Sequence, residues 1–172
     1  MANKLVIDGV TDTSFQPDRS ITRAEFAALV VRSLGIKPEA TGSTSFKDIS
    51  STDWYANIVA AAANAKIIDG YEDGTFKPNA SISREELAAM VVRAMKYAGL
   101  HTELSSTLQA SLLSRFTDAN QINWAQQEVA VAIDAGVING ITDLTIGPKQ
   151  SATRAESATM LKRFLTKAAF IN

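Results

Sequence analysis

A short segment that begins with Thr or Ser, continues with Arg and ends with Glu occurs three times in this chain. With the residue before it, the segment is Ile-Thr-Arg-Ala-Glu, Ile-Ser-Arg-Glu-Glu and Ala-Thr-Arg-Ala-Glu, at residues 21–25, 82–86 and 152–156. In every copy a proline stands five residues before the Thr or Ser, and a glycine-containing loop comes before the proline. Repetition at this length indicates that one structural unit occurs three times in a common fold.

Each copy has the signature of a helix N-terminus. Thr22, Ser83 and Thr153 suit the N-cap position, and the glutamate three residues later completes a capping box. Apolar residues at helical spacing follow in each copy, which indicates one buried face per helix. We expect these helices to pack together in a common core with pseudo-threefold packing. The segments predicted to be helical are 22–34, 83–97 and 153–166.

Two of the copies have a further helix in front of the loop. Phe46 and Trp54 introduce an alanine-rich stretch in the second copy, and Phe116 and Trp124 introduce a similar stretch in the third. The first copy has no counterpart of this block. The sequence therefore predicts one all-α domain over residues 1–172. Its repeats span approximately residues 1–38 (partial), 44–100 and 114–172, with leading helices near 53–66 and 123–135.

The repeats depart from one another in two places. The first repeat lacks its leading helix, which we interpret as a cut in a longer parent chain; the alternative is a helix supplied by a neighbouring chain. We expect exposed apolar surface around Leu5, Val6 and Phe26, which favours intermolecular packing. The second difference is an inserted linker of about residues 100–114, where leucines at positions 104, 108, 112 and 113 predict a short helix.

The composition excludes several classes of function. The chain has 17 Lys and Arg residues and 18 Asp and Glu residues, and its net charge is −1. This balance argues against nucleic-acid binding and against a polybasic membrane-binding surface. There are no cysteines, so neither disulfides nor cysteine-based metal sites can form. No stretch approaches the roughly 20 consecutive apolar residues of a membrane span.

Catalysis is also disfavoured. The single histidine, His101, lies in the linker, and a Ser-His-Asp triad would have to use it. Counting carboxylates does not exclude glycoside hydrolysis, but the acidic residues recur with the repeat, which is typical of scaffolding and binding. We therefore predict a non-enzymatic module with no metal site and no cofactor.

The arginine of each segment needs a separate explanation. Arg23, Arg84 and Arg154 occupy the first helical position, where a cation opposes the helix dipole at a cost of about 0.3–1 kcal/mol. One explanation is an ion pair with a nearby glutamate or with a loop aspartate. Because the unfavourable choice recurs, we favour an anionic ligand, since an arginine beside a helix N-terminus suits a carboxylate or phosphate. The loop aspartates are Asp12, Asp73 and Asp143.

The loops and the aromatic residues add groups that suit sugar binding. Gly70 and its counterparts permit tight turns and close approach of a ligand. Asp73 can accept hydrogen bonds from sugar hydroxyls or from its own turn backbone, and the second role is the commoner. Trp54 and Trp124 stand at positions where core packing is a commoner role than a sugar platform, so Tyr71 is the better platform candidate.

The Phe-x-Asp and Trp block, the loop Gly-Tyr-x-Asp-Gly-x-Phe-x-Pro and the Thr-Arg-Ala-Glu segment resemble the S-layer homology domain family. The resemblance covers nearly the whole chain except the linker. It implies a three-pronged fold around a central three-helix bundle. It also implies binding of secondary cell-wall polymers that bear pyruvate ketals, in grooves between adjacent repeats, with the arginine near the ketal carboxylate.

The resemblance further implies non-covalent anchoring at the cell wall or S-layer of a Gram-positive bacterium, through polysaccharide linked to peptidoglycan. Two alternatives stay open: a self-assembly or protein-interaction module without glycan binding, and the C-terminal anchor of an extracellular glycoside hydrolase. Only the second repeat has the loop pair Gly74 and Lys77, but its Glu85 adds a negative charge beside the arginine. The candidate glycan-binding residues are Thr22, Arg23, Glu25, Trp54, Gly70, Tyr71, Asp73, Lys77, Ser83, Arg84, Glu86, Trp124, Thr153, Arg154 and Glu156.

Overall fold

Six α-helices make up the part of the chain that the computed structural model describes, residues 14–39 and 45–170. The helices that follow the capping-box residues are α1 (Arg23–Ser33), α3 (Arg84–Tyr97) and α6 (Arg154–Lys167). The others are the leading helices α2 (Ala56–Asn64) and α5 (Gln126–Asp134), the linker helix α4 (Ser106–Leu113) and a 3-10 turn, η1 (Ala119–Gln121). These described residues contain isolated β-bridges but no strand. The predicted mainly helical class is confirmed.

The three central helices α1, α3 and α6 end in the same way. In each, the second residue after the helix has a left-handed backbone: Gly35 at φ 66°, Gly99 at φ 80° and Ala169 at φ 56°. Its amide and the next amide bond back to carbonyls of the last turn, as in a Schellman motif. Glycine adopts this conformation without strain, which explains why α1 and α3 end where the sequence places a glycine.

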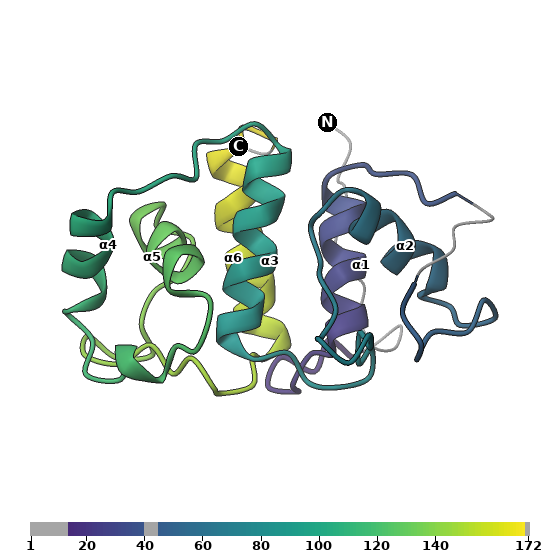
Figure 1. Cartoon of the computed structure of the whole chain (residues 1–172), viewed down its shortest axis with the longest axis horizontal. Helices are drawn as coiled ribbons and strands as arrows, with labels where there is room; N and C mark the ends of the chain where they lie inside the picture. The colour runs from purple at the N-terminus through teal and green to yellow at the C-terminus, as the bar shows by residue number, and fades with distance from the viewer. Residues whose placement is uncertain (1–13, 40–44, 171–172) are drawn as a thin grey trace.

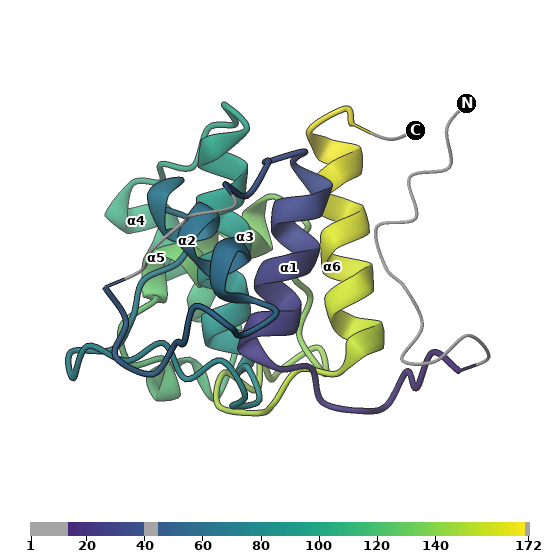
Figure 2. The same ribbon diagram turned by 90° about the vertical axis from the view of Figure 1, so that its right-hand side faces the viewer.

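The central helices α1, α3 and α6 contact one another, as the sequence predicts (Figure 2). Each leading helix packs on the central helix of the repeat before it, α2 on α1 and α5 on α3, and α4 packs on α5. Figure 1 shows α3 and α6 between the α4–α5 pair on one side and the α1–α2 pair on the other. The three-pronged symmetry of the whole domain stays a prediction.

A closed cycle of backbone hydrogen bonds joins the residues that precede the central helices. The amide of Ile21 donates to the carbonyl of Ala152 at 3.1 Å, that of Ala152 to Ile82 at 2.9 Å, and that of Ile82 back to Ile21 at 3.0 Å. All three residues are fully buried. Each therefore donates one bond and accepts one, and the polar backbone at the centre of the fold is satisfied without water.

The first repeat is better covered than we expected. Phe26 is fully buried in the core, so the prediction that it is exposed is wrong; Leu5 and Val6 lie outside the described residues. In the described part of the chain no leading helix packs on α6. At the position where α1 and α3 have the buried Val31 and Val92, α6 has the exposed Lys162. A polar residue at that position suits a helix face in contact with water.

None of the helices within residues 14–39 and 45–170 combines the length and the apolar content that crossing a membrane requires.

Candidate functional site

The three predicted capping boxes are all present. The hydroxyl groups of Thr22, Ser83 and Thr153 each accept a hydrogen bond of 3.2 Å from the amide three residues later. The glutamate at that later position accepts from the N-cap amide at 2.8–2.9 Å. One carboxylate oxygen of each glutamate is used in this bond, so the other oxygen is available for a second partner.

Arg23 is the centre of the first of two arginine corners, here called the Arg23 corner and formed by Arg23, Asp69, Phe76 and Glu86. Its side chain is 5% exposed. Nε donates to the carbonyl of Phe76 at 2.8 Å, Nη1 to the Glu86 carboxylate at 2.9 Å and Nη2 to the carbonyl of Asp69 at 3.4 Å. All these partners belong to the second repeat, so Arg23 joins the first repeat to the second.

Arg84 repeats the arrangement one step further along the chain, in the Arg84 corner formed by Arg84, Asn139, Ile146 and Glu156. Nε donates to the carbonyl of Ile146 at 2.8 Å, Nη1 to Glu156 at 2.6 Å and Nη2 to the carbonyl of Asn139 at 2.8 Å. Arg84 is almost fully buried and joins the second repeat to the third.

Arg154 continues the order, because its Nε donates to the carbonyl of Phe15 at 2.9 Å and its guanidinium lies 4.9 Å from the centre of the Phe15 ring. The arginines thus point from each repeat to the next, and from the third back to the first. For Arg23 and Arg84 the simple explanation of the motif, an ion pair with a glutamate, is what the structure shows. The glutamate belongs to the next repeat and not to the arginine's own helix.

Tyr71 is built into the Arg23 corner. Its hydroxyl donates to the same Glu86 oxygen that binds Arg23, at 2.5 Å. Two cations lie over its ring, the Arg23 guanidinium at 4.8 Å and the Lys77 ammonium at 4.0 Å. Burial and the hydrogen bond to Glu86 raise the pKa of Tyr71 to about 12, so the phenol is neutral at pH 7. The Tyr71 ring therefore stabilises the Arg23 corner, and with two cations over it the ring is less suited to stacking against a sugar.

The loop aspartate has the commoner of its two predicted roles. Asp73 accepts from the backbone amide of Thr75 at 2.9 Å and from the Thr75 hydroxyl at 2.6 Å. These two bonds, then the weaker attraction of Lys77 and Lys47, hold the pKa of Asp73 below its ordinary value although burial acts slightly in the other direction. The Asp73 carboxylate shapes the turn, and it lies outside the cavity described next.

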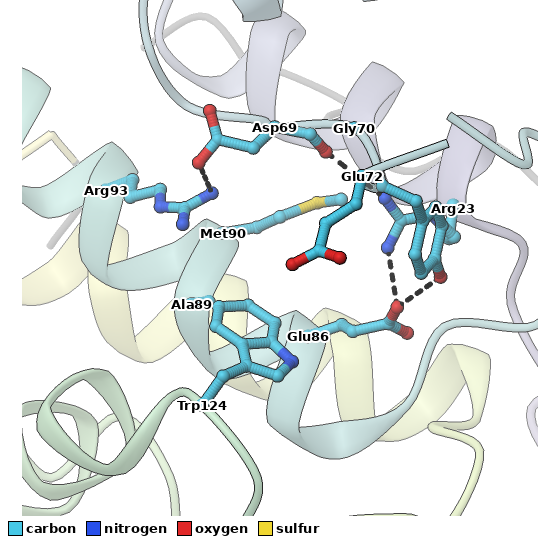
Figure 3. Close-up of a pocket in the computed structure, with 10 residues that line it drawn as sticks. Arg23, Asp69, Gly70, Glu72, Glu86, Ala89, Met90, Arg93 and Trp124 are labelled. Carbon is cyan, nitrogen blue, oxygen red and sulfur yellow. Dashed lines mark hydrogen bonds and ion pairs between the residues drawn. The ribbon is translucent and has the colours of Figure 1, made fainter. Parts of the chain in front are cut away.

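A cavity of about 340 Å³ opens beside the Arg23 corner (Figure 3). It has polar walls from the loop of the second repeat, an apolar floor from α3 and an aromatic wall from the third repeat. Of the candidate residues, the structure brings Arg23, Gly70, Tyr71, Glu86 and Trp124 together here. The remaining lining residues are Asp69, Glu72, Ala89, Met90 and Arg93.

Trp54 and Trp124 are 60% and 52% exposed, so the core-packing role that we considered the commoner one is wrong for both. Only Trp124 lines the cavity, with its ring 5.8 Å from the Arg93 guanidinium. Gly70 lies against the ring of Phe46, and a Cβ atom at this position would approach that ring to 2.4 Å and the carbonyl oxygen of Thr75 to 2.7 Å. The glycine is therefore required for packing of the loop.

The sequence interpretation missed Arg93, the more exposed of the two cavity arginines. Its guanidinium pairs with the carboxylate of Asp69 at 2.8 Å, and its side chain is 23% exposed against 5% for Arg23. A signal for it was present, because each central helix has an arginine nine residues after the first one, at positions 32, 93 and 163. The described residues contain no cluster of three or more His, Asp or Glu side chains that could hold a metal ion.

Several larger proteins contain a region similar to this chain. It is 40% identical over 97% of its length to an amylopullulanase of Thermoanaerobacterium thermosulfurigenes, and 39% identical over 97% to the exoglucanase XynX of Acetivibrio thermocellus. It is 31% identical over 89% of its length to a cellulosome-anchoring protein of Acetivibrio thermocellus. The chain spans only 9%, 15% and 34% of the length of these three relatives.

A family of domains matches this chain in three segments, one in each repeat. Residues 1–27, 45–88 and 115–158 each match the S-layer homology domain, and the unmatched residues include the linker helix α4. Each matched segment ends inside the central helix of its repeat, so it includes the arginine and the capping box. Together with the similarity to an anchoring protein, these matches support a role in cell-surface anchoring. The chain belongs to the S-layer homology domain family.

Proposed function

We propose that this domain anchors a larger extracellular protein to the bacterial cell wall by binding an anionic secondary cell-wall polysaccharide, without catalysis. The observation that carries the proposal is the cavity beside the Arg23 corner, which combines two guanidinium groups with a half-exposed tryptophan. Arginine forms charge-assisted, often bidentate hydrogen bonds with carboxylates. An aromatic ring offers an apolar face to the C–H groups of a sugar.

The charged group of the polysaccharide is, in this proposal, the carboxylate of a pyruvate ketal. The cavity has the size of a small-molecule site and is lined by residues of all three repeats, since Arg23, Tyr71 and Trp124 come from the first, second and third. Such a site exists only when the repeats are assembled. Binding of the polymer would therefore stabilise the assembled domain.

The two cavity arginines have different parts in this proposal. Arg23 has three protein acceptors and is nearly buried, so its main contribution is to hold the second repeat in place. Arg93 has one carboxylate partner, Asp69, whose side chain is 72% exposed. Because water and a ligand can both reach this pair, we assign the first contact with the ketal carboxylate to Arg93, with Arg23 behind it.

The test is calorimetric titration of the domain with cell-wall polysaccharide before and after chemical removal of its pyruvate. Arg93→Gln should weaken binding of the pyruvylated polymer roughly ten- to a hundredfold, because one charge-assisted hydrogen bond contributes about 1.5–3 kcal/mol. Lys96→Gln removes the same charge from an exposed position of the same helix outside the cavity and is the matched control. Equal affinity for the two forms of the polymer would show that the ketal is not the recognised group.

The same titration separates this proposal from self-assembly without glycan binding. A self-assembling module would show no heat with either form of the polysaccharide and would change its mass with protein concentration instead. The names of the two enzyme relatives agree with a domain that can accompany hydrolases, and a Gram-positive wall is the source of polymer that we propose to use first.

A further inference from the structure

We propose that Glu85 is a positioning residue that holds Trp124 in place as the aromatic wall of the cavity. The inference rests on the proposed function, because the wall matters only if the cavity binds a ligand. Glu85 lies on α3 in the second repeat, and Trp124 lies just before α5 in the third. The two other repeats have alanine at the matching position, Ala24 and Ala155.

Glu85 and Arg84 are neighbours in the sequence but have different hydrogen-bond partners. One of its oxygens accepts from the three successive amides of Asn123, Trp124 and Ala125, at 2.8, 3.0 and 3.3 Å. The other oxygen accepts from the Lys149 ammonium at 3.0 Å. The Glu85 side chain is 2% exposed, and these four bonds satisfy a carboxylate that would otherwise be costly to bury.

The three amides belong to Ala125, the N-cap residue of α5, and to the two residues before it, and α5 has no side-chain cap. The N-cap residue Ala125 has no side chain that could accept a hydrogen bond, and the first amides of a helix have no acceptor within the helix. A carboxylate near these amides also interacts favourably with the helix dipole. Glu85 therefore holds the residues that lead into α5 from another repeat and fixes the backbone on both sides of Trp124.

The second repeat has a carboxylate within the tryptophan loop itself. Asp53 precedes Trp54, and its carboxylate accepts from the amide of Ser50 at 2.8 Å. In the third repeat the residue at the position of Asp53 is Asn123. The carboxylate that organises the tryptophan loop thus belongs to the loop in one repeat and to the preceding central helix in the other.

The consequence for the cavity is that Trp124 is half-exposed and yet held at its backbone. Figure 3 shows the indole of Trp124 facing the cavity near Ala89, across from Glu72. A wall that is fixed before the ligand arrives costs less conformational entropy on binding than one that must be ordered. Loss of Glu85 should therefore lower affinity for the ligand although Glu85 is not itself a lining residue.

A double-mutant cycle on the full chain tests this role, with a pyruvylated cell-wall glycan as the probe. Glu85→Ala should weaken binding about tenfold in the wild-type protein and less than about twofold in a Trp124→Ala background, because coupled residues give non-additive effects. Equal effects of Glu85→Ala in both backgrounds would overturn the inference. If the wild-type protein does not bind the probe, the proposed function has failed, and this result differs from binding that is insensitive to Glu85.

Two further variants guard against a simple loss of folding. Lys149→Met keeps the three amide bonds and removes only the counter-charge, so it should leave affinity close to that of the wild type. Adding Asn123→Asp to Glu85→Ala restores a loop carboxylate, as in the second repeat, and should recover most of the affinity. In a Trp54→Phe background, the fluorescence anisotropy of Trp124 should fall with Glu85→Ala and recover with Asn123→Asp. A rescue that restores stability but neither affinity nor anisotropy would contradict a positioning role.

Discussion

The Arg23 corner and the Arg84 corner share one hydrogen-bond pattern and differ in what surrounds it. In both, the guanidinium meets two backbone carbonyls and one glutamate of the next repeat. Around Arg23 the remaining space is filled by the rings of Tyr71 and Phe76, with centres 4.8 and 4.7 Å from the guanidinium carbon. The matching residues in the third repeat are Ile141 and Ile146.

The comparison shows which residues the hydrogen-bond pattern requires and which can vary. Backbone carbonyls are present whatever the side chains are, so only the arginine and the glutamate must be specified for the bonds to form. The aromatic rings add cation–π attraction and a second donor to the glutamate, but the Arg84 corner forms without them. The hydrogen bonds of the Arg84 corner are shorter. Arg84 donates to Glu156 and to Asn139 at 2.6 and 2.8 Å, whereas the matching bonds of Arg23 are 2.9 and 3.4 Å long.

The largest expected effect comes from removing the glutamate of each corner. Glu86→Ala should lower the free energy of unfolding by about 3–5 kcal/mol, because it leaves a buried guanidinium without its counter-charge. Glu156→Ala should cost less, since the Glu156 side chain is 33% exposed against 16% for Glu86 and water can replace it more easily. Urea unfolding measures both values. An equal or larger loss for Glu156→Ala would show that the exposure of the glutamate does not set the cost of removing it.

A smaller effect is expected from the glycines of the two loops. Gly140→Ala should destabilise by about 1–3 kcal/mol, because its Cβ would lie 2.2 Å from the carbonyl oxygen of Thr142 and 2.7 Å from that of Thr145. Gly70→Ala should cost less, since its closest contact is a ring atom of Phe46, which can move. Glu72→Ala, at an exposed position of the loop that contains Gly70, is the control for the general effect of placing alanine in this loop. Thermal unfolding that ranks Gly70→Ala above Gly140→Ala would contradict this order.

Tyr71→Phe tests the one bond that the Arg84 corner lacks. It should lower stability at pH 8 by about 1 kcal/mol, the typical net value of a hydrogen bond. The folded-state pKa of Tyr71 is about 12 against an ordinary 10.0, so its stabilisation is fully present below pH 10 and is lost as the pH rises toward 12. The stability difference between wild type and variant, measured by urea unfolding, should therefore shrink over this pH range. A constant difference would mean that the phenol and Glu86 are not coupled.

The smallest effect concerns a backbone position that all three repeats share. Gln16, Lys77 and Gly147 match one another, and all have a left-handed backbone, with φ values of 51°, 55° and 65°. Gln16→Gly, at an exposed position, removes strain of roughly 1–2 kcal/mol and adds glycine's entropy cost of roughly 0.5–1 kcal/mol. We expect a net gain of a few tenths of a kcal/mol in chemical unfolding. Gly147→Lys should show the opposite sign, and a gain from both substitutions would exclude backbone strain as the cause.

Much of the fold was predictable because local signals were strong and mutually consistent. The capping boxes, the apolar periodicity and the glycines at helix ends fix where α1 and α3 begin and end, and each depends on residues only a few positions apart. The sequence could not show which repeat an arginine would reach. Arg23 and Glu86 are 63 residues apart, and Glu25 was an equally good local partner in the sequence.

The candidate site was predicted in part for the same reason. Loop residues Gly70 and Tyr71 and the central arginine do meet at one cavity, but the sequence did not indicate the partners of Glu85. Its pKa shows the balance: burial raises it, while the amide of Trp124, then Lys149, then the amides of Ala125 and Asn123 lower it, and the net shift is downward. The partners come from the third repeat, and no local pattern in the second repeat points to them.

The cycle of backbone bonds between Ile21, Ile82 and Ala152 also sets how many units the domain can contain. In an open solenoid each unit leaves donors and acceptors for one more, so the number of units can vary. Here every amide and carbonyl in the cycle is already used by the other two members, and a fourth unit would find no vacant partner. An additional unit would therefore have to break one of these three bonds, so the cycle sets the number of units at three.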